Sequence, residues 1–187
     1  MHDLGRNEDR LRGTYEFPFE FHHIDSSHPR YVMSYHWHVE CEIMRVLQGT
    51  LTVTLDEKSF TAKAGDVIFV NSGVLHSGIP QDCIYQCIVF DMNMFLKFNS
   101  VCTEYMQKIS HQELLIYHHF TEKQPDIRRA VNSLFDSFWQ RKPGYELVVF
   151  GQFYHFFGLV FGNHYYLESL RKTRRDYKRI VQLKQVV

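Results

Sequence analysis

Four side chains of the metal-ligand type stand at fixed distances from three glycines in the first half of the chain. They form the pattern H-x-H-x3-E-x6-G, followed by G-x5-N-x-G-x2-H. The four are His36, His38, Glu42 and His76, and the glycines are Gly49, Gly65 and Gly73. Alternate side chains of a strand point to the same face. The even spacing therefore predicts that one face of one extended segment carries His36, His38 and Glu42, and that His76 joins them from a neighbouring strand of a barrel.

Three imidazoles and one carboxylate on a concave β-surface suit either a divalent metal or the polar groups of a small organic ligand. Imidazole-rich ligation favours zinc, nickel, iron or manganese over calcium. The chain has twelve histidines, so one H-x-H pair alone would be uninformative, and the prediction depends on the joint spacing. We therefore predict a ligand-binding and metal-binding set of His36, His38, Glu42 and His76, and no catalytic residue.

Residues 15–92 predict a series of short strands. Apolar and polar residues alternate over positions 17–21 and 51–55, and short apolar runs follow at 67–70 and 84–90. Turn-forming residues separate these runs, among them Gly65-Asp66 and Asn71-Ser72-Gly73. Such a succession, without helical periodicity, is typical of an antiparallel sandwich or barrel. Residues 1–14 are polar and aperiodic, so they are predicted to form a mobile N-terminal arm.

Helical periodicity begins only after residue 92. One helix is predicted over 126–140, because six apolar residues share one of its faces: Ile127, Val131, Leu134, Phe135, Phe138 and Trp139. A second helix, predicted over 145–161, is apolar nearly all round, so every face of it needs cover. We therefore predict that 93–170 form a helical region whose two helices make a homodimer. A fully intramolecular core is the equal alternative.

Composition excludes several classes of protein. The chain has 187 residues, enough for one domain with an appendage, and its 21 basic and 21 acidic residues argue against the whole chain binding nucleic acid. The longest apolar region is too short and too broken to span a bilayer, and the N-terminus lacks a signal-peptide pattern. The four cysteines contain no C-x2-C pair and are expected to be reduced. These features predict a cytoplasmic protein without membrane contact.

The C-terminal end is strongly basic. Seven of the last seventeen residues are Lys or Arg: Arg171, Lys172, Arg174, Arg175, Lys178, Arg179 and Lys184. A DNA reader needs a recognition element that enters a groove, and the sequence offers no such helix after this run. Residues 171–187 are therefore predicted to be a basic linker.

The two spaced patterns resemble the two motifs of the cupin family, G-x5-H-x-H-x3-4-E-x6-G and G-x5-P-x-G-x2-H-x3-N. The family's metal-ligand positions match His36, His38, Glu42 and His76. Three turn positions depart from the motifs: Arg30 replaces the opening glycine, Asn71 the proline and Pro80 the final asparagine. The resemblance implies a mainly β fold with α-helices, in which a cupin-like antiparallel β-barrel (double-stranded β-helix or jelly roll) at 15–92 precedes a C-terminal helical pair.

A narrower resemblance covers residues 15–187. The segments Gly49–Val53 and Gly65–Ser72, with Gly144-Tyr145-Glu146-Leu147 opening the second helix, are similar to the amino-terminal sensor domain of AraC-family transcription regulators. This resemblance implies a small-molecule-sensing and dimerisation domain of a bacterial regulator. Its effector, a sugar or related metabolite, would bind near the four motif residues. The linker at 171–187 would lead to a helix-turn-helix domain, absent from this chain, that binds DNA.

Two other functions fit the same motifs. Three neutral imidazoles and one carboxylate leave open coordination positions on a metal, as a stand-alone metal-dependent cupin enzyme such as an isomerase or dioxygenase requires. A dimerisation module with a vestigial pocket is the weaker alternative. The long aromatic helical region favours the sensor over a minimal barrel enzyme, and we therefore expect no enzymatic activity.

Overall fold

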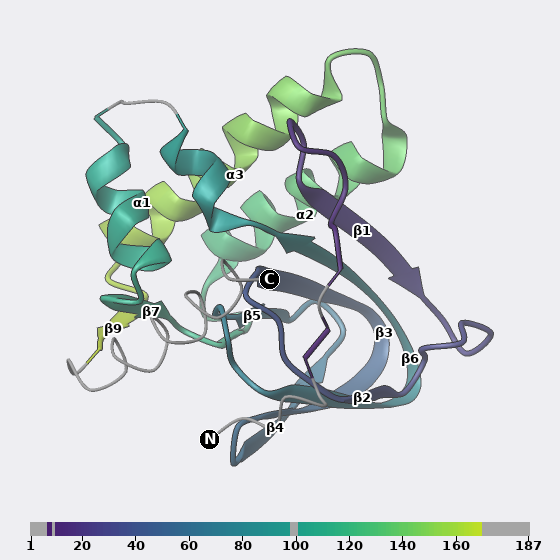
Figure 1. The fold of residues 1–187 in the computed structure, drawn as a ribbon. Coiled ribbons are helices and arrows are strands. Elements are labelled where there is room, and N and C mark those ends of the chain that lie inside the picture. The colour runs from purple at the N-terminus through teal and green to yellow at the C-terminus, as the bar shows by residue number, and fades with distance from the viewer. Residues whose placement is uncertain (1–6, 9, 98–100, 170–187) are drawn as a thin grey trace.

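The computed structural model describes residues 7–8, 10–97 and 101–169 (Figure 1). Its body is a curled seven-stranded sheet in which every strand pair is antiparallel. The strands are β1 (Phe19–Ile24), β2 (Met33–His36), β3 (Cys41–Leu55), β4 (Lys58–Lys63), β5 (Val67–Val70), β6 (His76–Phe90) and β8 (His119–Phe120). β3 and β6 form the spine, paired from Cys41↔Phe90 to Leu55↔His76. The predicted antiparallel architecture is confirmed.

The helices follow the sheet in the chain and lie together on one side of it (Figure 1). They are the 3-10 helix η2 (Met92–Leu96), α1 (Thr103–Ser110), α2 (Pro125–Gln140) and α3 (Tyr145–Gly162). The helices predicted at 126–140 and 145–161 are confirmed as α2 and α3. The range 93–170 is not purely helical, since β8 extends the main sheet and β7 (Leu114–Ile116) pairs with β9 (Tyr166–Glu168).

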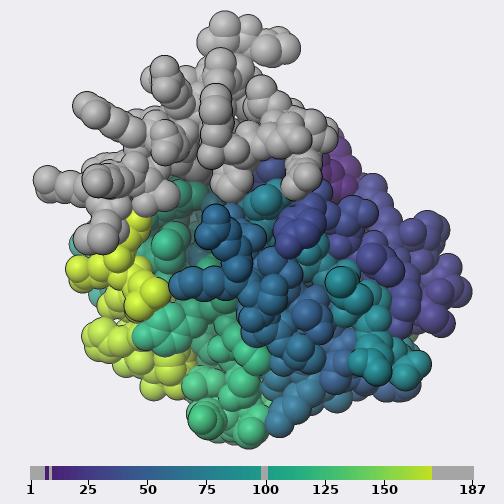
Figure 2. All heavy atoms as spheres, turned by 90° about the horizontal axis from the view of Figure 1, so that it is seen from below, coloured from purple at the N-terminus to yellow at the C-terminus, as the bar shows by residue number. Residues whose placement is uncertain are grey.

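Strand alternation divides the core into two layers. Along β3, Met44 and Val46 point into the curl of the sheet, whereas Cys41 and Ile43 point toward the helices. The inner cluster also contains Leu51, Val53, Ile68, Val70, Cys83, Tyr85 and Cys87. β3, β5 and β6 therefore carry buried residues on both faces, and Figure 2 shows strand and helix residues side by side on one face of the molecule.

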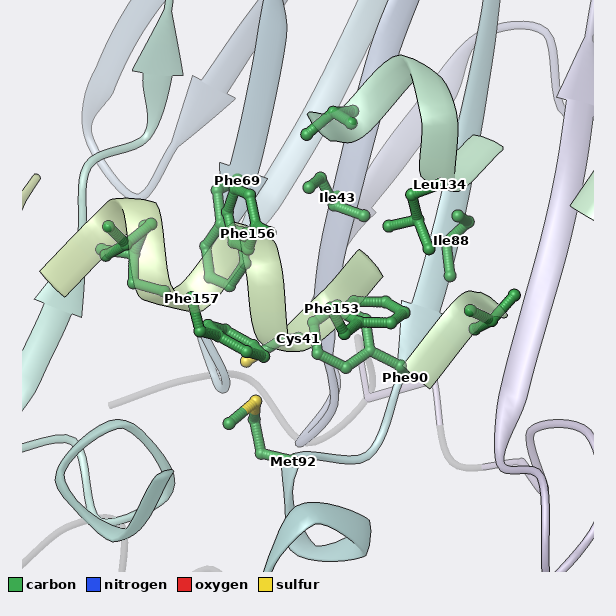
Figure 3. Close-up of a cluster of buried hydrophobic side chains, with 14 of the residues drawn as sticks. Cys41, Ile43, Phe69, Ile88, Phe90, Met92, Leu134, Phe153, Phe156 and Phe157 are labelled. Atoms are coloured by element: carbon green, nitrogen blue, oxygen red, sulfur yellow. The ribbon is translucent and has the colours of Figure 1, made fainter. Parts of the chain in front are cut away.

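Aromatic packing joins the helices to the outer face of the sheet. Phe153, Phe156 and Phe157 of α3 are fully buried, against Phe69 and Phe90 from the strands (Figure 3). Ring centroids are 4.6 Å apart for Phe90 and Phe153, within the range of favourable aromatic contacts. This face of α3 belongs to the intramolecular core.

The opposite side of α3 is exposed. The apolar pattern of this helix had not shown whether all of its faces pack inside the same chain. Leu147, Val148 and Tyr154 are 80%, 49% and 37% exposed. A Cβ built on Gly151 or Gly158 would meet nothing within 4 Å, so these glycines face open space. α3 therefore covers the sheet with one side and presents an apolar strip with the other.

Asn71 shows why a motif position departs from proline. Its side chain is 3% exposed, and its amide nitrogen donates to the Ile116 carbonyl (2.8 Å) while its amide oxygen accepts from the Ile116 backbone N–H (3.0 Å). Proline could make neither bond. Asn71 thus fastens β7 to the end of β5, near the site described below.

No helix in the described ranges has the length and apolar character needed to cross a membrane.

Candidate functional site

The four motif residues come from three strands and one connection at one end of the curled sheet. His36 ends β2 and pairs with His76, the first residue of β6. Glu42 is the second residue of β3, and His38 lies in the connection between β2 and β3. The prediction that one extended segment carries His36, His38 and Glu42 is wrong, because the chain bends at residues 39–40 and β3 starts only at Cys41.

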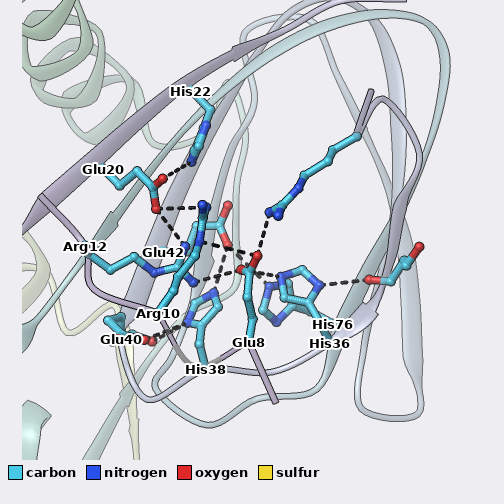
Figure 4. A network of polar contacts seen from close by, with 12 residues as sticks. Glu8, Arg10, Arg12, Glu20, His22, His36, His38, Glu40, Glu42 and His76 are labelled. Atoms are coloured by element: carbon cyan, nitrogen blue, oxygen red, sulfur yellow. Dashed lines mark hydrogen bonds and ion pairs between the residues drawn. The ribbon is translucent and has the colours of Figure 1, made fainter. Parts of the chain in front are cut away.

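The structure nevertheless brings all four side chains together. One ligand atom from each lies within 4.8 Å of the ligand atoms of the other three. Glu42 Oε2 is 3.3 Å from His38 Nε2 and 3.3 Å from His76 Nε2, and the rings of His36 and His76 are 4.2 Å apart (Figure 4). His38, Glu42 and His76 are buried, whereas His36 is partly exposed toward the cavity.

Backbone carbonyls orient the three imidazoles. Nδ1 of His36 contacts the Ser34 carbonyl at 2.8 Å, and Nδ1 of His76 contacts the Val74 carbonyl at 2.8 Å. Nδ1 of His38 contacts the Glu40 carbonyl at 3.0 Å. A carbonyl only accepts, so each Nδ1 must carry the proton, and each Nε2 of a neutral ring then has a free lone pair. This tautomer is the one that a metal-binding histidine needs.

The lone pairs of three Nε2 atoms and the Glu42 carboxylate point to one place. A positive charge at that place would be bound favourably. His76 Nε2 is buried without a hydrogen-bond partner in the described part of the chain. Burial alone would raise the pKa of Glu42, but hydrogen bonds and positive charge from His38 and His76 in their protonated form outweigh this and hold the pKa well below its usual value; beside neutral rings, a divalent cation would take over this role. Burial and the neighbouring His76 lower the pKa of His36, which favours its neutral ring. The four residues therefore fit a divalent cation.

A cavity of about 390 Å³ opens from the cluster toward the N-terminal segment. Its inner wall includes Ile24, Met33 and Tyr85, and Cys87 lies beside Glu42. Burial and the Glu42 carboxylate raise the pKa of the Cys87 thiol well above its usual value, so this group stays protonated. The volume falls within the range of small-molecule sites.

A group of charged residues at the mouth of this cavity was not predicted from the sequence motifs. Glu8, Arg10 and Arg12 come from the N-terminal segment, and Arg30 was noted only as a departure from a motif glycine. Alternation of charge at positions 8, 10 and 12 was the available signal, because residues two apart share a face of an extended chain. Residues 7 and 8 lie along Trp37, where the Glu8 backbone N–H donates to the Trp37 carbonyl at 2.9 Å.

These charges form one network (Figure 4). The Glu8 carboxylate accepts hydrogen bonds from Arg12 and Arg30, and its Oε2 is 3.8 Å from His36 Nε2. Partial burial would raise the pKa of Glu8, but the two guanidinium groups outweigh it and lower the pKa to about 2. Arg12 also donates to Glu20 at 2.7 Å. The mouth of the cavity is thus lined by paired charges next to the histidine cluster.

Glu40 does not join the cluster. Its side chain is 15% exposed, and its carboxylate oxygen lies 3.7 Å from His38 Nδ1, on the side of the ring away from Glu42. It can influence the orientation of His38 but does not face the common point of the four ligand atoms.

Comparisons with known proteins place these observations in a family. Residues 18–148 match the model of the AraC-like ligand binding domain. An HTH-type transcriptional regulator of Bacillus subtilis, YdeC, is 34% identical over 56 residues, which are 28% of this chain and 19% of that protein. The chain thus spans about a fifth of the length of this relative.

Two solved structures share smaller parts. Oxalate decarboxylase of Bacillus subtilis is 24% identical over 32% of this chain and 18% of its own, with a TM-score of 0.30. The conserved SPY1581 protein of Streptococcus pyogenes is 15% identical over 39% of this chain and 62% of its own, with a TM-score of 0.34.

The family match spans the whole curled sheet, the histidine cluster, helices α1 and α2, and the start of α3. It agrees with the resemblance drawn from the spaced glycines, histidines and Glu42. The chain belongs to the family of AraC-like ligand binding domains, the sensing domains of AraC-family regulators, and has their cupin-like fold.

Proposed function

We propose that this chain senses a small polar molecule for a bacterial AraC-family regulator, and that the molecule binds in the cavity beside the histidine cluster. The observation that carries the proposal is the position of this cavity of about 390 Å³, on strands whose opposite face packs against α2 and α3. A molecule bound on one face of such a sheet can change how the helices on the other face are held. It can do so only by binding one arrangement more tightly than the other.

A divalent metal held by His36, His38, Glu42 and His76 is part of this proposal. The buried and unpartnered Nε2 of His76 and the carbonyl-bound Nδ1 atoms support it. Zinc, nickel, iron and manganese suit such a ligand set. The metal would supply a Lewis-acidic position for an oxygen of the effector, and the half-exposed His36 leaves that side open to the cavity.

Arg45 offers a physical link between the two faces. It lies on β3, three residues after Glu42, and is 8% exposed. Its guanidinium donates to Gln86 at 2.8 Å on β6 and to Asp136 at 2.9 Å on α2. Gln86 stands next to Cys87, which lines the cavity. A shift of β3 or β6 on ligand binding would therefore reach α2 through these bonds.

We propose a homodimer formed by the exposed side of α3. Leu147, Val148 and Tyr154 make the apolar strip there, and the open glycines allow another helix to approach. Leu147→Glu should halve the mass seen in light scattering, whereas Val101→Glu, at a residue 92% exposed elsewhere, should leave it unchanged. A monomeric wild-type chain at high concentration would contradict this interface.

DNA binding belongs to the proposal only through a further helix-turn-helix domain. The basic segment 171–187, predicted to be a linker, lies outside the described residues. The predicted boundaries of an arm at 1–14, a barrel at 15–92 and a dimerisation region at 93–170 are kept as working divisions. Cytoplasmic location remains part of the same proposal.

Native mass spectrometry tests metal and ligand binding together. Protein purified without added metal should carry about one divalent ion per chain, and His38→Ala should lose it. His111→Ala, at an exposed histidine outside the cavity, is the matched control and should keep it. A wild-type chain without metal that still binds an effector would reduce the proposal to direct recognition by the imidazoles.

A metal-dependent enzyme is the second candidate, and the open side of His36 favours it. Incubation of the metal-loaded chain with any molecule that binds should leave that molecule unchanged by NMR if the chain only senses it. Turnover that is lost in Glu42→Gln would make the enzyme the better conclusion.

A further inference from the structure

The charges at the mouth of the cavity have a feature that the proposed sensing function does not use. Glu8 places a carboxylate among three guanidinium groups: Arg30 donates to its Oε1, Arg12 donates to its Oε2 at 2.8 Å, and Arg10 Nε lies 3.5 Å from its Oε1. The same Oε2 is 3.8 Å from His36 Nε2. One carboxylate therefore lies at the mouth of the cavity, between the arginines and the histidine cluster (Figure 4).

We propose that Arg12 and Arg30 form a carboxylate-binding subsite, which Glu8 fills in this structure and which takes the carboxylate of a small organic acid when the effector binds. The inference rests on the proposed sensing function and narrows its ligand to an organic acid. Guanidinium groups bind carboxylates through charge-assisted hydrogen bonds, and two groups on opposite oxygens fix the orientation of the ligand.

The burial of Arg12 supports a built site. The residue is 2% exposed, and its Nε has no hydrogen-bond partner among the described residues, although it lines the cavity. A second anion, Glu20, already holds its Nη1 at 2.7 Å, so the guanidinium stays in place if Glu8 leaves. An incoming carboxylate would therefore meet a positioned donor group.

Apart from these ion pairs, the contacts of Glu8 with other described residues involve its backbone. Its segment contacts Trp37 through an isolated bridge at Asn7 and one backbone hydrogen bond from Glu8. The Glu8 carboxylate is tethered beside the two arginines and competes with a free carboxylate for them. Its effective concentration there is roughly millimolar. Removing it should therefore strengthen the binding of an organic acid, because the competitor is gone.

Matched probes separate charge from shape. Galacturonate and galactose differ chiefly in a carboxylate, as do succinate and succinamide, and inorganic phosphate is the test of a general anion site. Affinities for the metal-loaded wild-type chain and its variants are measured by calorimetry. We expect at least one acid to bind, and its neutral counterpart to bind about tenfold more weakly or worse.

Three variants then locate the subsite. Glu8→Gln should tighten the binding of that acid about tenfold, and Arg30→Gln, at a side chain 60% exposed, should weaken it by a similar factor. Arg129→Gln, at an exposed arginine on α2, should leave it unchanged. Melting temperatures of all variants verify that they are folded.

The outcomes that overturn the subsite differ from those that overturn sensing. If galactose binds as tightly as galacturonate, and neither Glu8→Gln nor Arg30→Gln changes the affinity, the subsite is wrong and sensing stands. Phosphate binding that exceeds that of every acid would replace the carboxylate by a phosphate. If no probe binds the wild-type chain or Glu8→Gln, the subsite is rejected. A screen of unrelated metabolites then tests the sensing function, which is rejected as well if none of them binds the wild-type chain.

Discussion

The same strands bury apolar side chains on the outer face of the curled sheet and a charged, metal-ligand cluster on the inner face. On β3, Ile43 points to the helices and is fully buried among apolar residues, whereas its neighbour Glu42 points inward and is buried among imidazoles. The outer face gains free energy by removing apolar area from water. The inner face buries a carboxylate, which costs free energy unless charges or hydrogen bonds compensate it.

This difference teaches where stability and binding reside. The outer face is filled by rings, such as Phe69 against Phe156 at 5.8 Å. The end of the inner face holds three imidazole lone pairs and a carboxylate at one point. We therefore expect changes on the outer face to alter folding first, and changes on the inner face to alter metal and ligand binding first.

The largest effect should come from the outer face. Phe153→Ala removes a fully buried ring that contacts Phe19, Phe90 and Phe95, so the free energy of unfolding should fall by about 3–5 kcal/mol. Urea unfolding at fixed protein concentration measures it. Val101→Ala, at 92% exposure, should change it by no more than about 0.5 kcal/mol. If the two substitutions lowered the free energy of unfolding equally, the outer face would not be the main source of stability.

Metal removal should have the next largest effect, and it probes the inner face. A ligand that binds only the folded chain stabilises it by about 2.7 kcal/mol at a hundredfold excess over Kd. Adding a chelator should therefore lower the melting temperature of the wild-type chain. The same chelator should have no effect on His76→Ala, which lacks a buried ligand, and its full effect on His111→Ala. A chelator effect that persists in His76→Ala would mean that the metal binds elsewhere.

An intermediate effect is expected where the two faces are connected. Arg45→Met leaves the Gln86 amide oxygen buried without its donor, so unfolding should become easier by about 1–3 kcal/mol. The double variant Arg45→Met, Gln86→Leu should recover part of this loss, because it removes both partners. If the double variant is as unstable as the sum of the single ones, Arg45 acts through packing on Phe135 instead.

The sequence allowed the sheet, the two long helices and the four cluster residues to be predicted. Gly65 and Gly73 adopt positive φ in turns, at 86° and 76°, and Gly49 adopts it, at 66°, where the register of β3 shifts. The cluster was predictable because it depends on local spacing. The reason given for it was nevertheless wrong, since a bend at 39–40, and not one continuous strand, delivers Glu42 to the histidines.

The remaining features depend on contacts between distant segments. Arg12 pairs with Glu20, and Arg30 pairs with Glu8 across 22 positions, so the local spacing of charges at positions 8, 10 and 12 predicts a shared face but not these partners. The same holds for β8, a strand of two residues that exists only because β5 offers a free edge. The apolar pattern of α3 did not predict which side packs inward, because that side is determined by contacts with aromatic rings of the sheet.

The smallest effect on stability, and the finest test of the two faces, concerns the thiols. None of the four cysteines forms a disulfide; Cys41 on the outer face and Cys83 and Cys87 on the inner face are buried, whereas Cys102 is partly exposed. Burial raises the pKa of Cys41 to about 12 and that of Cys83 to about 11. Since only the thiolate reacts, Cys41 should react far more slowly at neutral pH than an ordinary exposed thiol.

A disulfide reagent at neutral pH should therefore label one thiol per native chain quickly, at Cys102, and all four after unfolding. Cys102→Ser should abolish the fast phase and change the free energy of unfolding by less than about 0.5 kcal/mol. A second fast thiol, located by peptide mapping, would tell which face opens: Cys87 would mean that the reagent enters the cavity beside Glu42, and Cys41 that the helices part from the sheet. Since Cys87 lines the cavity and Cys41 does not, Glu8→Gln should speed labelling of Cys87 alone if Glu8 obstructs the mouth.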